Sequence, residues 1–248
     1  MSSTSTVYLI SGANRGIGLA LVTQLAAREN TIVFAGARNP SSAKDLQVLE
    51  SKYSGKVHLI KLTSPHEADN KAAVAQVKKI AGRLDVVIAN AGLSNSFVPS
   101  DQVTLDSMRE HFEVNVLGPL VLFQATWPLL KAGSSPKFVV ISSALGSIEV
   151  GTTFPIPVLP YGTTKAAVDW LAAKLWFEYP SLISFPLHPG AVATDMAAAG
   201  RAALPEGMDF PMIQTDESAT GILKVVDAAK RDEAGPKLMA WDGSVIPW

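Results

Sequence analysis

Short apolar runs rich in β-branched residues alternate along the chain with longer segments in which apolar residues recur at helical spacing. The short runs cover residues 7–11, 31–37, 56–62, 84–89, 137–142 and 182–187. They lack the apolar–polar alternation of a strand with one solvated face, so we expect strands that are covered on both faces. The helical segments are residues 17–28, 43–52, 68–81, 105–117 and 163–179. This alternation predicts an α/β fold: a doubly wound parallel sheet with helices on both faces, in three layers.

Two segments interrupt the alternation. Residues 151–160 include Pro155, Pro157 and Pro160, and because proline has no backbone N–H, we expect an extended or turning loop there. The segment 196–214 is rich in Ala, Gly, Pro and Met and follows a predicted strand, where ligands bind in open α/β sheets. We therefore predict substrate loops around residues 144–160 and 195–214; plain surface insertions are the alternative. No repeat or change in composition marks a boundary, so residues 1–248 are interpreted as one domain.

The composition excludes several kinds of partner. The chain has 21 Lys and Arg against 22 Asp and Glu, so its formal net charge of −1 creates no field to attract nucleic acid or an anionic membrane. It has no cysteine, and His58, His66, His111 and His188 lack metal-ligand spacing, so no metal site is expected. The richest apolar run, residues 116–130, is interrupted by Gly and Pro and is shorter than a membrane helix. With its short polar N-terminus, the chain is predicted to be cytoplasmic.

A glycine-rich turn follows the first predicted strand. Residues 12–18 read Gly-Ala-Asn-Arg-Gly-Ile-Gly and lead directly into a predicted helix. Gly12 would permit a sharp exit from the strand, Gly16 would let the backbone approach a pyrophosphate, and Gly18 would let the helix pack closely on the strand. The free amides and the dipole at the start of the helix favour a phosphate there. A glycine turn between strand and helix therefore predicts a dinucleotide-binding site.

The end of the second predicted strand bears on which dinucleotide is bound. An acidic residue there would bind the ribose hydroxyls of NAD, but residues 33–38 contain none. Arg38 ends this run and Arg15 lies inside the glycine turn, so two guanidiniums could hold a 2′-phosphate through bidentate hydrogen bonds. NADP(H) is therefore the predicted cofactor. The alternative is that both arginines face solvent.

Tyr161 and Lys165 are the candidate catalytic pair. Residues four apart share a helix face, so the lysine charge can lie within reach of the tyrosine hydroxyl or of a common ligand. A nearby positive charge favours the phenolate and lowers a tyrosine pKa that is ordinarily about 10. Such a tyrosine can exchange a proton near neutral pH. Because this spacing also arises by chance on surface helices, its meaning depends on the other motifs.

Further motifs follow the predicted strands in order. They are Asn90-Ala91-Gly92, Asn115, Ser142-Ser143, and Pro189-Gly190 with Thr194. Together with the glycine turn and the Tyr161–Lys165 pair, they resemble the short-chain dehydrogenase/reductase family over nearly the whole chain. The resemblance implies a Rossmann-like fold and an NADP-dependent oxidoreductase. The segments 34–39, 188–190 and 241–248 are similar to a fungal branch of the family that is typified by norsolorinic acid ketoreductase.

The resemblance also implies a role for each catalytic candidate. Tyr161 would protonate the carbonyl oxygen of the substrate, and Lys165 would lower the tyrosine pKa and bind the nicotinamide ribose. Ser143, in preference to Ser142, would hold the same oxygen, and Asn115 would order a water that resupplies the proton. The cofactor-binding residues that sequence and resemblance predict together are Gly12, Asn14, Arg15, Gly16, Ile17, Gly18, Arg38, Leu62, Asn90, Ala91, Gly92, Tyr161, Lys165, Pro189, Gly190, Val192 and Thr194.

Two features depart from the family pattern. Lys61 stands where many relatives carry an aspartate for the adenine amino group, so the resemblance does not predict that contact here. The stretch between Ser143 and Tyr161 is longer than in many relatives, and its proline-rich part would reshape the substrate mouth without moving the tyrosine.

The segments around the pair indicate the class of substrate. The expected walls are mainly apolar and consist of Ala144, Leu145, Phe154, Ile156, Val192, Met196, Met208, Phe210 and Met212. We therefore predict NADPH-dependent reduction of a bulky apolar or aromatic ketone, of polyketide type by resemblance, unless several of these side chains belong to the core. A non-catalytic, NADP(H)-sensing regulatory protein on the same fold is the alternative function, and loss of Tyr161, Lys165 or Ser143 would be its signature.

The helix of Tyr161 carries a heavy apolar load in Trp170, Leu171, Trp176 and Phe177. In the family this helix often packs against its copy in a second subunit, so the resemblance implies a homodimer or homotetramer. Burial of these side chains inside one subunit is the competing interpretation.

Overall fold

The computed structural model describes residues 5–204, 206–207, 209–231 and 233–248. In this part of the chain, eight strands form one sheet in the order β3-β2-β1-β4-β5-β6-β7-β8. The strands are β1 (Thr6–Ile10), β2 (Thr31–Ala37), β3 (Val57–Lys61), β4 (Val86–Ala89), β5 (Lys137–Ile141), β6 (Ile183–His188), β7 (Leu238–Ala240) and β8 (Val245–Ile246). All neighbouring strands from β3 to β7 pair in parallel, and β8 pairs antiparallel with β7. The predicted parallel sheet is confirmed, and an antiparallel strand extends one edge.

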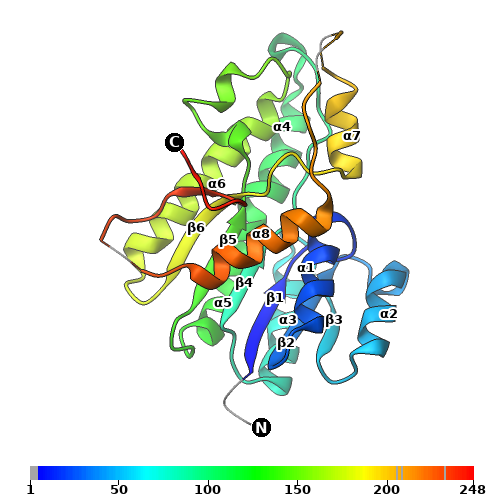
Figure 1. Ribbon diagram of the computed structural model, residues 1–248, viewed down its shortest axis with the longest axis vertical. Coiled ribbons are helices and arrows are strands. Elements are labelled where there is room, and N and C mark those ends of the chain that lie inside the picture. The colour runs from blue at the N-terminus through cyan, green and yellow to red at the C-terminus, as the bar shows by residue number, and fades with distance from the viewer. Residues whose placement is uncertain (1–4, 205, 208, 232) are drawn as a thin grey trace.

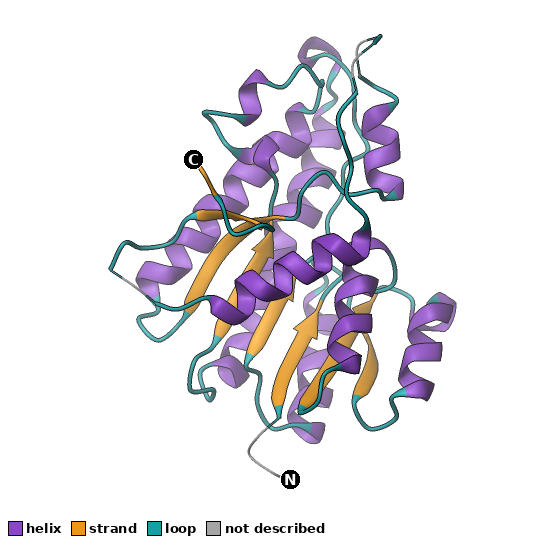
Figure 2. Cartoon of the chain, viewed as in Figure 1, coloured by secondary structure: helices purple, strands orange, loops and turns teal. Residues whose placement is uncertain are grey.

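Helices cover both faces of this sheet (Figure 1, Figure 2). One layer consists of α1 (Gly16–Ala27), α2 (Lys44–Lys52) and α8 (Thr215–Ala228), and α1 contacts both of its neighbours. The other layer consists of α3 (Glu67–Ile80), α5 (Gly118–Leu130) and α6 (Leu159–Glu178). Each layer closes its own apolar core against the sheet. The three-layer, doubly wound arrangement is a Rossmann-like α/β fold.

The strand order reverses between β1 and β4, because the chain proceeds from β1 outward to β3 and then returns to place β4 on the other side of β1. In such sheets, ligands bind in the crevice beyond the carboxyl ends of the strands at the reversal. Two further helices, α4 (Leu105–Phe112) and α7 (Asp195–Arg201), lie beyond that end of the sheet (Figure 1). We therefore expect a ligand site among the loops between the carboxyl strand ends and these two helices.

The segment predicted as one helix over 105–117 has a more complex course. After α4, the residues of η3 (Glu113–Leu117) form a π-helical turn, and the chain continues directly into α5. Helix α5 was not predicted because Gly118, Pro119 and Pro128 interrupt its apolar run. Pro119 lies in the first turn of α5, directly after the π-helical turn. The continuous helical segment from α4 through η3 to α5, called the rod below, thus connects the carboxyl end of the sheet with the apolar core that α5 covers.

Helix α6 begins at Leu159, four residues before the predicted start. Pro160 is at its first turn, a position where proline is compatible with a helix. Tyr161 therefore lies in the first turn of α6, at the carboxyl end of the sheet. In the described part of the chain, every helix is too short or too polar to span a bilayer.

The two predicted loops contain short helices. Residues 144–160 include the 3-10 turns η4 (Ala144–Gly146) and η5 (Gly151–Thr153), and residues 195–214 begin with α7. Positions 205 and 208 lie outside the described residues. The backbone N–H of Glu149 donates to the carbonyl oxygen of Trp248 over 3.1 Å, so the end of the chain borders the first loop. Two more 3-10 turns, η1 (Pro40–Ser42) and η2 (Ser100–Gln102), precede α2 and α4.

Candidate active site

The glycine turn forms a cradle at the start of α1. Gly12 and Gly16 have φ values of +62° and +55°, in the left-handed region that favours glycine. A Cβ atom on Gly18 would lie 2.3 Å from the carbonyl oxygen of Gly12, so helix and strand approach too closely for any side chain there. Arg15 caps α1 without a side-chain hydrogen bond, and the first amides of the helix stay available to an anion. This geometry fits the pyrophosphate of a dinucleotide.

Asn90 locks the turn to the segment after β4. Its side-chain Nδ2 donates to the carbonyl oxygens of Ser11 and Gly12, both over 3.0 Å. The Ser11 hydroxyl accepts from the backbone amides of Asn90 and Ala91, also over 3.0 Å. A Cβ atom on Gly12 would lie 2.8 Å from Cα of Ala91. The predicted residues 90–92 therefore lie against the glycine turn, with the Asn90 amide committed to its shape.

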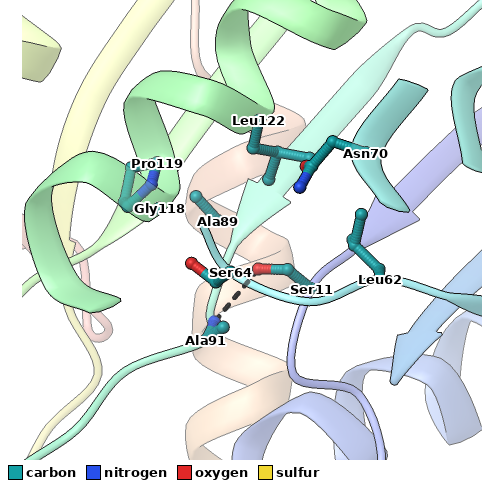
Figure 3. Close-up of a pocket in the computed structure, with 9 residues that line it drawn as sticks. All are labelled: Ser11, Leu62, Ser64, Asn70, Ala89, Ala91, Gly118, Pro119 and Leu122. Atoms are coloured by element: carbon teal, nitrogen blue, oxygen red, sulfur yellow. Dashed lines mark hydrogen bonds between the residues drawn. The ribbon is translucent and has the colours of Figure 1, made fainter. Parts of the chain in front are cut away.

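A small cavity opens beside this junction (Figure 3). Its lining residues are Ser11, Leu62, Ser64, Asn70, Ala89, Ala91, Gly118, Pro119 and Leu122. Its volume of about 10 Å³ is enough for about one water molecule. Leu62 and Ala91, both predicted cofactor residues, contribute to its wall (Figure 3). Tyr161 is not among the lining residues, so the cavity belongs to the β1–β4 crevice and not to the catalytic centre.

Lys61, which departs from the family pattern, is engaged by α3. Its Nζ lies 3.1 Å from Oδ1 of Asp69, and the same oxygen is 3.3 Å from Nδ1 of His66. A hydrogen bond from Thr63 and the Lys61 ammonium lower the pKa of Asp69. The ionised carboxylate of Asp69, from α3, thus lies beside Lys61 at the end of β3.

Both arginines of the predicted phosphate clasp are exposed, as in the alternative interpretation of the sequence. Arg38 directly follows β2. Arg15 turns instead toward α7, where its Nη1 lies 3.1 Å from Oδ2 of Asp195. The acidic first turn of α7, far away in sequence, supplies the competing carboxylate. Both side chains are largely exposed, and such a pair contributes about 0–1 kcal/mol, so Arg15 can exchange Asp195 for another anion at little cost.

Tyr161, Ser143 and Lys165 come together at the carboxyl end of β5. Burial raises the pKa of Tyr161 to about 12, and the nearby Ser143, which lowers this pKa, has a smaller effect. Lys165 is 4% exposed, and its Nζ donates to the carbonyl oxygen of Ile141 over 2.6 Å and lies 5.4 Å from the centre of the Tyr161 ring. Burial lowers the pKa of Lys165 to about 8. Because the pKa of Tyr161 is about 12, its phenol is protonated at neutral pH.

The prediction that Lys165 lowers the tyrosine pKa stays a prediction: its ammonium lies 5.4 Å from the centre of the ring, but burial dominates the pKa of the phenol. The negative charge of Asp169 raises the pKa of Tyr161 further. Both effects come from tertiary packing, which the spacing of two residues does not encode. The preference for Ser143 also stays a prediction; Ser143 lowers the pKa of Tyr161, whereas Ser142 lowers that of Asp169.

Asn115 links the loop after β4 to the catalytic helix. Its Oδ1 accepts from the amide of Leu93 over 2.7 Å, and its Nδ2 donates to the carbonyl of Leu93 over 2.8 Å and to the hydroxyl of Thr164 over 3.0 Å. A Cβ atom on Gly92 would lie 3.5 Å from Asn115 Oδ1 and 3.7 Å from Lys165 Nζ. The predicted residues Gly92, Asn115 and Lys165 therefore converge on one spot.

The segment after β6 faces the glycine turn across the crevice. Gly190 has a φ of +91°, and a Cβ atom there would lie 2.8 Å from Ile213. The hydroxyl of Ser218 donates to the carbonyl of Pro189 over 2.6 Å and fixes the start of the segment. At its end, Thr194 caps α7, and its methyl group would be 3.4 Å from a Cβ atom on Gly16. The predicted residues Pro189, Gly190, Val192 and Thr194 thus form the wall opposite the start of α1.

His188 and Asp169 were not predicted as site residues. Nδ1 of His188 accepts from the amide of Ala144 over 3.1 Å, and burial lowers the pKa of this histidine to about 4, which keeps it a neutral acceptor. It thereby fixes the backbone directly after Ser143. Asp169 lies one turn beyond Lys165 on α6 and is 3% exposed. An acidic residue within a helical row of buried positions was its available signal in the sequence.

Comparison with known proteins agrees with this geometry. The sequence profile of the short chain dehydrogenase family matches residues 6–204. An uncharacterised oxidoreductase of Schizosaccharomyces pombe is 40% identical and covers 100% of both chains. Norsolorinic acid ketoreductase of Dothistroma septosporum is 35% identical over 99% of this chain and 94% of its own. The crystal structure of an NADPH-bound carbonyl reductase from chicken fatty liver aligns with a TM-score of 0.89 and 32% identity, over 98% of this chain and 99% of that one.

The chain belongs to the short-chain dehydrogenase/reductase family. It is therefore an oxidoreductase, and its eight-stranded sheet matches that of solved family members. The residues of the cradle fit a dinucleotide of the kind that the family implies, because Gly12 and Gly18 let the turn pack tightly while no side chain caps the first amides of α1.

The expected walls of this short-chain dehydrogenase lie mostly outside its core. Val192 is buried, whereas Ala144, Leu145, Ile156, Met196, Phe210 and Met212 are half-buried and Phe154 is 42% exposed. Met208 lies outside the described residues. Core burial, which was the competing interpretation, therefore accounts for Val192 and not for the other described walls.

Proposed function

We propose that this short-chain dehydrogenase uses NADPH to reduce a bulky apolar or aromatic ketone to an alcohol. The observation that carries the proposal is that Tyr161 lies near Ser143 and beside the Lys165 ammonium, at the carboxyl edge of a sheet whose glycine turn fits a dinucleotide. Both hydroxyls are donors at the place where a carbonyl oxygen would gain charge, and such donors lower the barrier. The family relationship gives the same class of chemistry.

The roles of the residues follow from their protonation. Bound NADPH supplies the hydride. Tyr161, protonated because burial raises its pKa to about 12, gives its proton to the carbonyl oxygen, and Ser143 donates a hydrogen bond to that oxygen. Lys165 stabilises the phenolate that remains, since its ammonium lies above the same ring. Asn115 positions Thr164 and Leu93 around the lysine.

Four observations support NADP(H) over NAD(H). Arg38 is exposed at the end of β2, where it can reach a 2′-phosphate, and residues 33–38 contain no acid to bind the ribose hydroxyls of NAD. Arg15 is held elsewhere only by an exposed ion pair. A relative of similar fold is an NADPH-bound carbonyl reductase.

The substrate class rests on the surface around Tyr161. The first loop exposes Ile148, Phe154 and Leu159, with 72%, 42% and 44% of their surface accessible. Exposed apolar side chains that cluster on a loop beside polar catalytic groups are typical of a site for an apolar ligand. The relationship to norsolorinic acid ketoreductases favours an aromatic polyketide-type ketone.

A steady-state assay tests the proposal. Purified protein is mixed with NADPH or NADH and a panel of aromatic, bicyclic and aliphatic ketones, and loss of the reduced-nicotinamide absorbance is followed. We expect turnover of the aromatic ketones with NADPH, and a loss of about 10²–10⁴-fold in kcat for Tyr161→Phe. Tyr53→Phe, at the end of α2, is the matched control and is expected to retain wild-type rates. If NADPH binds but no carbonyl compound is reduced, the sensor interpretation replaces this one.

We further propose that residues 1–248 act as one domain and assemble as a homodimer or homotetramer. One sheet that includes both β1 and β8 supports the first point. On α6, Trp176 is 5% exposed and thus belongs to the subunit's own core, whereas Trp170 and Phe177 are 69% and 67% exposed. Two large aromatic side chains one heptad apart on a helix surface favour a second subunit as their cover.

A further inference from the structure

A third buried polar residue extends the face of α6 that carries the catalytic pair. Tyr161, Lys165 and Asp169 are spaced four residues apart, and such residues lie above one another on one helix face. Lys165 and Asp169 are 4% and 3% exposed. The neighbouring buried positions Val168 and Ala172 are apolar. A carboxyl group therefore lies one turn below the lysine, away from solvent and from the substrate loops.

The carboxyl group of Asp169 is poorly compensated. Its Oδ1 is buried and makes no full hydrogen bond to any described residue, and the same holds for the hydroxyl of Ser142. Ser142 is nevertheless near enough to favour the charged form of Asp169. Burial of a charged group without full pairing is costly, and it raises the pKa of Asp169 to about 7. Packing alone gives no reason to retain an acid here.

The charged group that acts on Asp169 is Lys165, which favours its ionised form. Other titratable groups on elements that pack against α6 are engaged elsewhere. His188 at the end of β6 accepts from Ala144, and Lys137 at the start of β5 donates to the carbonyl of Val226. On α4, His111 contacts Ser107 and Asn95, Arg109 pairs with Asp106, and Glu110 accepts from Asn95. On α6 itself, Lys174 and Glu178 pair at 3.4 Å on the exposed side.

We propose that Asp169 is a positioning residue of the active site, whose buried carboxylate keeps Lys165 in its ammonium form, with Ser142 near enough to favour the charged form of that carboxylate. It acts through Lys165 and touches neither substrate nor cofactor. The charge of Asp169 raises the pKa of Lys165, against the burial that lowers it. The same charge raises the pKa of Tyr161. With both pKa values raised, Lys165 stays an ammonium and Tyr161 stays a phenol up to a higher pH. Ketone reduction needs both groups in these protonated forms.

Only the consequence for turnover rests on the proposed function, so the experiment reads the lysine directly. Full-length protein labelled with ¹³C at the lysine Cε is titrated by NMR, and the Lys165 resonance is assigned by its loss in Lys165→Met. The variants are Asp169→Asn, which removes the charge and keeps the shape, Asp169→Glu, which restores the charge, and Ser142→Ala. Glu178→Gln is the matched control, because it removes an exposed carboxylate from the same helix. The pH profile of kcat at saturating NADPH and ketone is measured in parallel.

We expect Asp169→Asn to lower the Lys165 pKa by about one unit, because both residues are buried on one helix face, where charges are weakly screened. The basic limb of kcat would move down by the same amount, and Asp169→Glu would recover most of both shifts. Ser142→Ala would move both in the same direction by less, and it carries the test if Asp169→Asn does not fold. Glu178→Gln would move neither.

A Lys165 titration that is unchanged in folded Asp169→Asn, or in Ser142→Ala where only that variant folds, overturns the proposal. A lysine shift in a protein that reduces no ketone supports the role of Asp169 and counts against the proposed function alone. A fall in kcat with no displacement of its pH limb would assign Asp169 a purely structural role and also overturns the proposal.

Discussion

Asp169 should make the protein lose stability as the pH rises, and its replacement by asparagine should remove that loss. The pKa of this buried carboxyl group is raised from 3.8 to about 7. A raised carboxyl pKa means that the stabilising contribution is fully present below about pH 4, where the group is protonated in both states, and is lost as the pH rises through about 7. Asparagine is isosteric and carries no charge, so it keeps the packing and abolishes the titration.

The magnitude follows from the difference between the two pKa values. Three units correspond to a cost on the order of 4 kcal/mol for the ionised group in the folded state. Between about pH 5 and about pH 7.5, roughly two of these units are lost, or about 2–3 kcal/mol. The free energy of unfolding of the wild type should thus fall by that amount relative to Asp169→Asn. For a chain of this size, the difference corresponds to about 5–10 °C in Tm.

Urea unfolding, followed by tryptophan fluorescence at these two pH values, measures the effect. The relevant quantity is the difference between Asp169→Asn and wild type at each pH, because the contributions of groups that do not interact with Asp169 cancel in it. Glu178→Gln, which removes an exposed carboxylate from the same helix, should give no difference that depends on pH. If the Asp169→Asn difference is the same at both pH values, the carboxyl group does not titrate in this range and the reasoning from burial is refuted.

Two further substitutions test the cofactor site and its support. Arg38→Asp should lower kcat/KM with NADPH by about 10–100-fold, the equivalent of one or two charge-assisted hydrogen bonds, and should leave NADH kinetics nearly unchanged. Lys79→Glu, at the far end of α3, is its control, and an unaltered preference in Arg38→Asp would disprove the assigned phosphate contact. Asn115→Ala should lower the free energy of unfolding by about 1–3 kcal/mol in urea titrations, because it leaves Leu93 and Thr164 without their buried partner. A variant as stable as wild type would show that these hydrogen bonds have no net value.

The sheet could be predicted because its strands are short, apolar on both faces and separated by helical segments. All six predicted strands exist; both ends of β2 coincide with the prediction, and no strand end differs by more than two residues. The three residues of β7 and the two of β8 are too few for a periodic signal, and they form strands because β6 offers a free edge. Helix α5 was missed because proline and glycine disfavour helices locally, whereas packing against α3 and the sheet stabilises this one.

The candidate site was predictable in its chemistry and not in its electrostatics. Motif residues as distant as Gly92, Asn115 and Lys165 converge, since the parallel strands bring their carboxyl ends to one edge. The direction of the Arg15 side chain depends on Asp195, which lies far away in the sequence. The high pKa of Tyr161 depends on burial and on Asp169. Such long-range effects have no signature in the spacing of residues.

The π-helical turn η3 gives the rod from α4 to α5 an angular offset. Each residue of an α-helix advances the chain by about 100°, so one additional residue in a turn rotates everything before it by about that angle relative to an unbroken helix. The rod can thereby direct α4 toward α6 and α5 toward α3. Removal of a single residue from 113–117 would turn the buried side of α4, with His111, away from its neighbours and Asn115 away from Leu93. In related chains, the length of this turn should therefore vary less than its sequence.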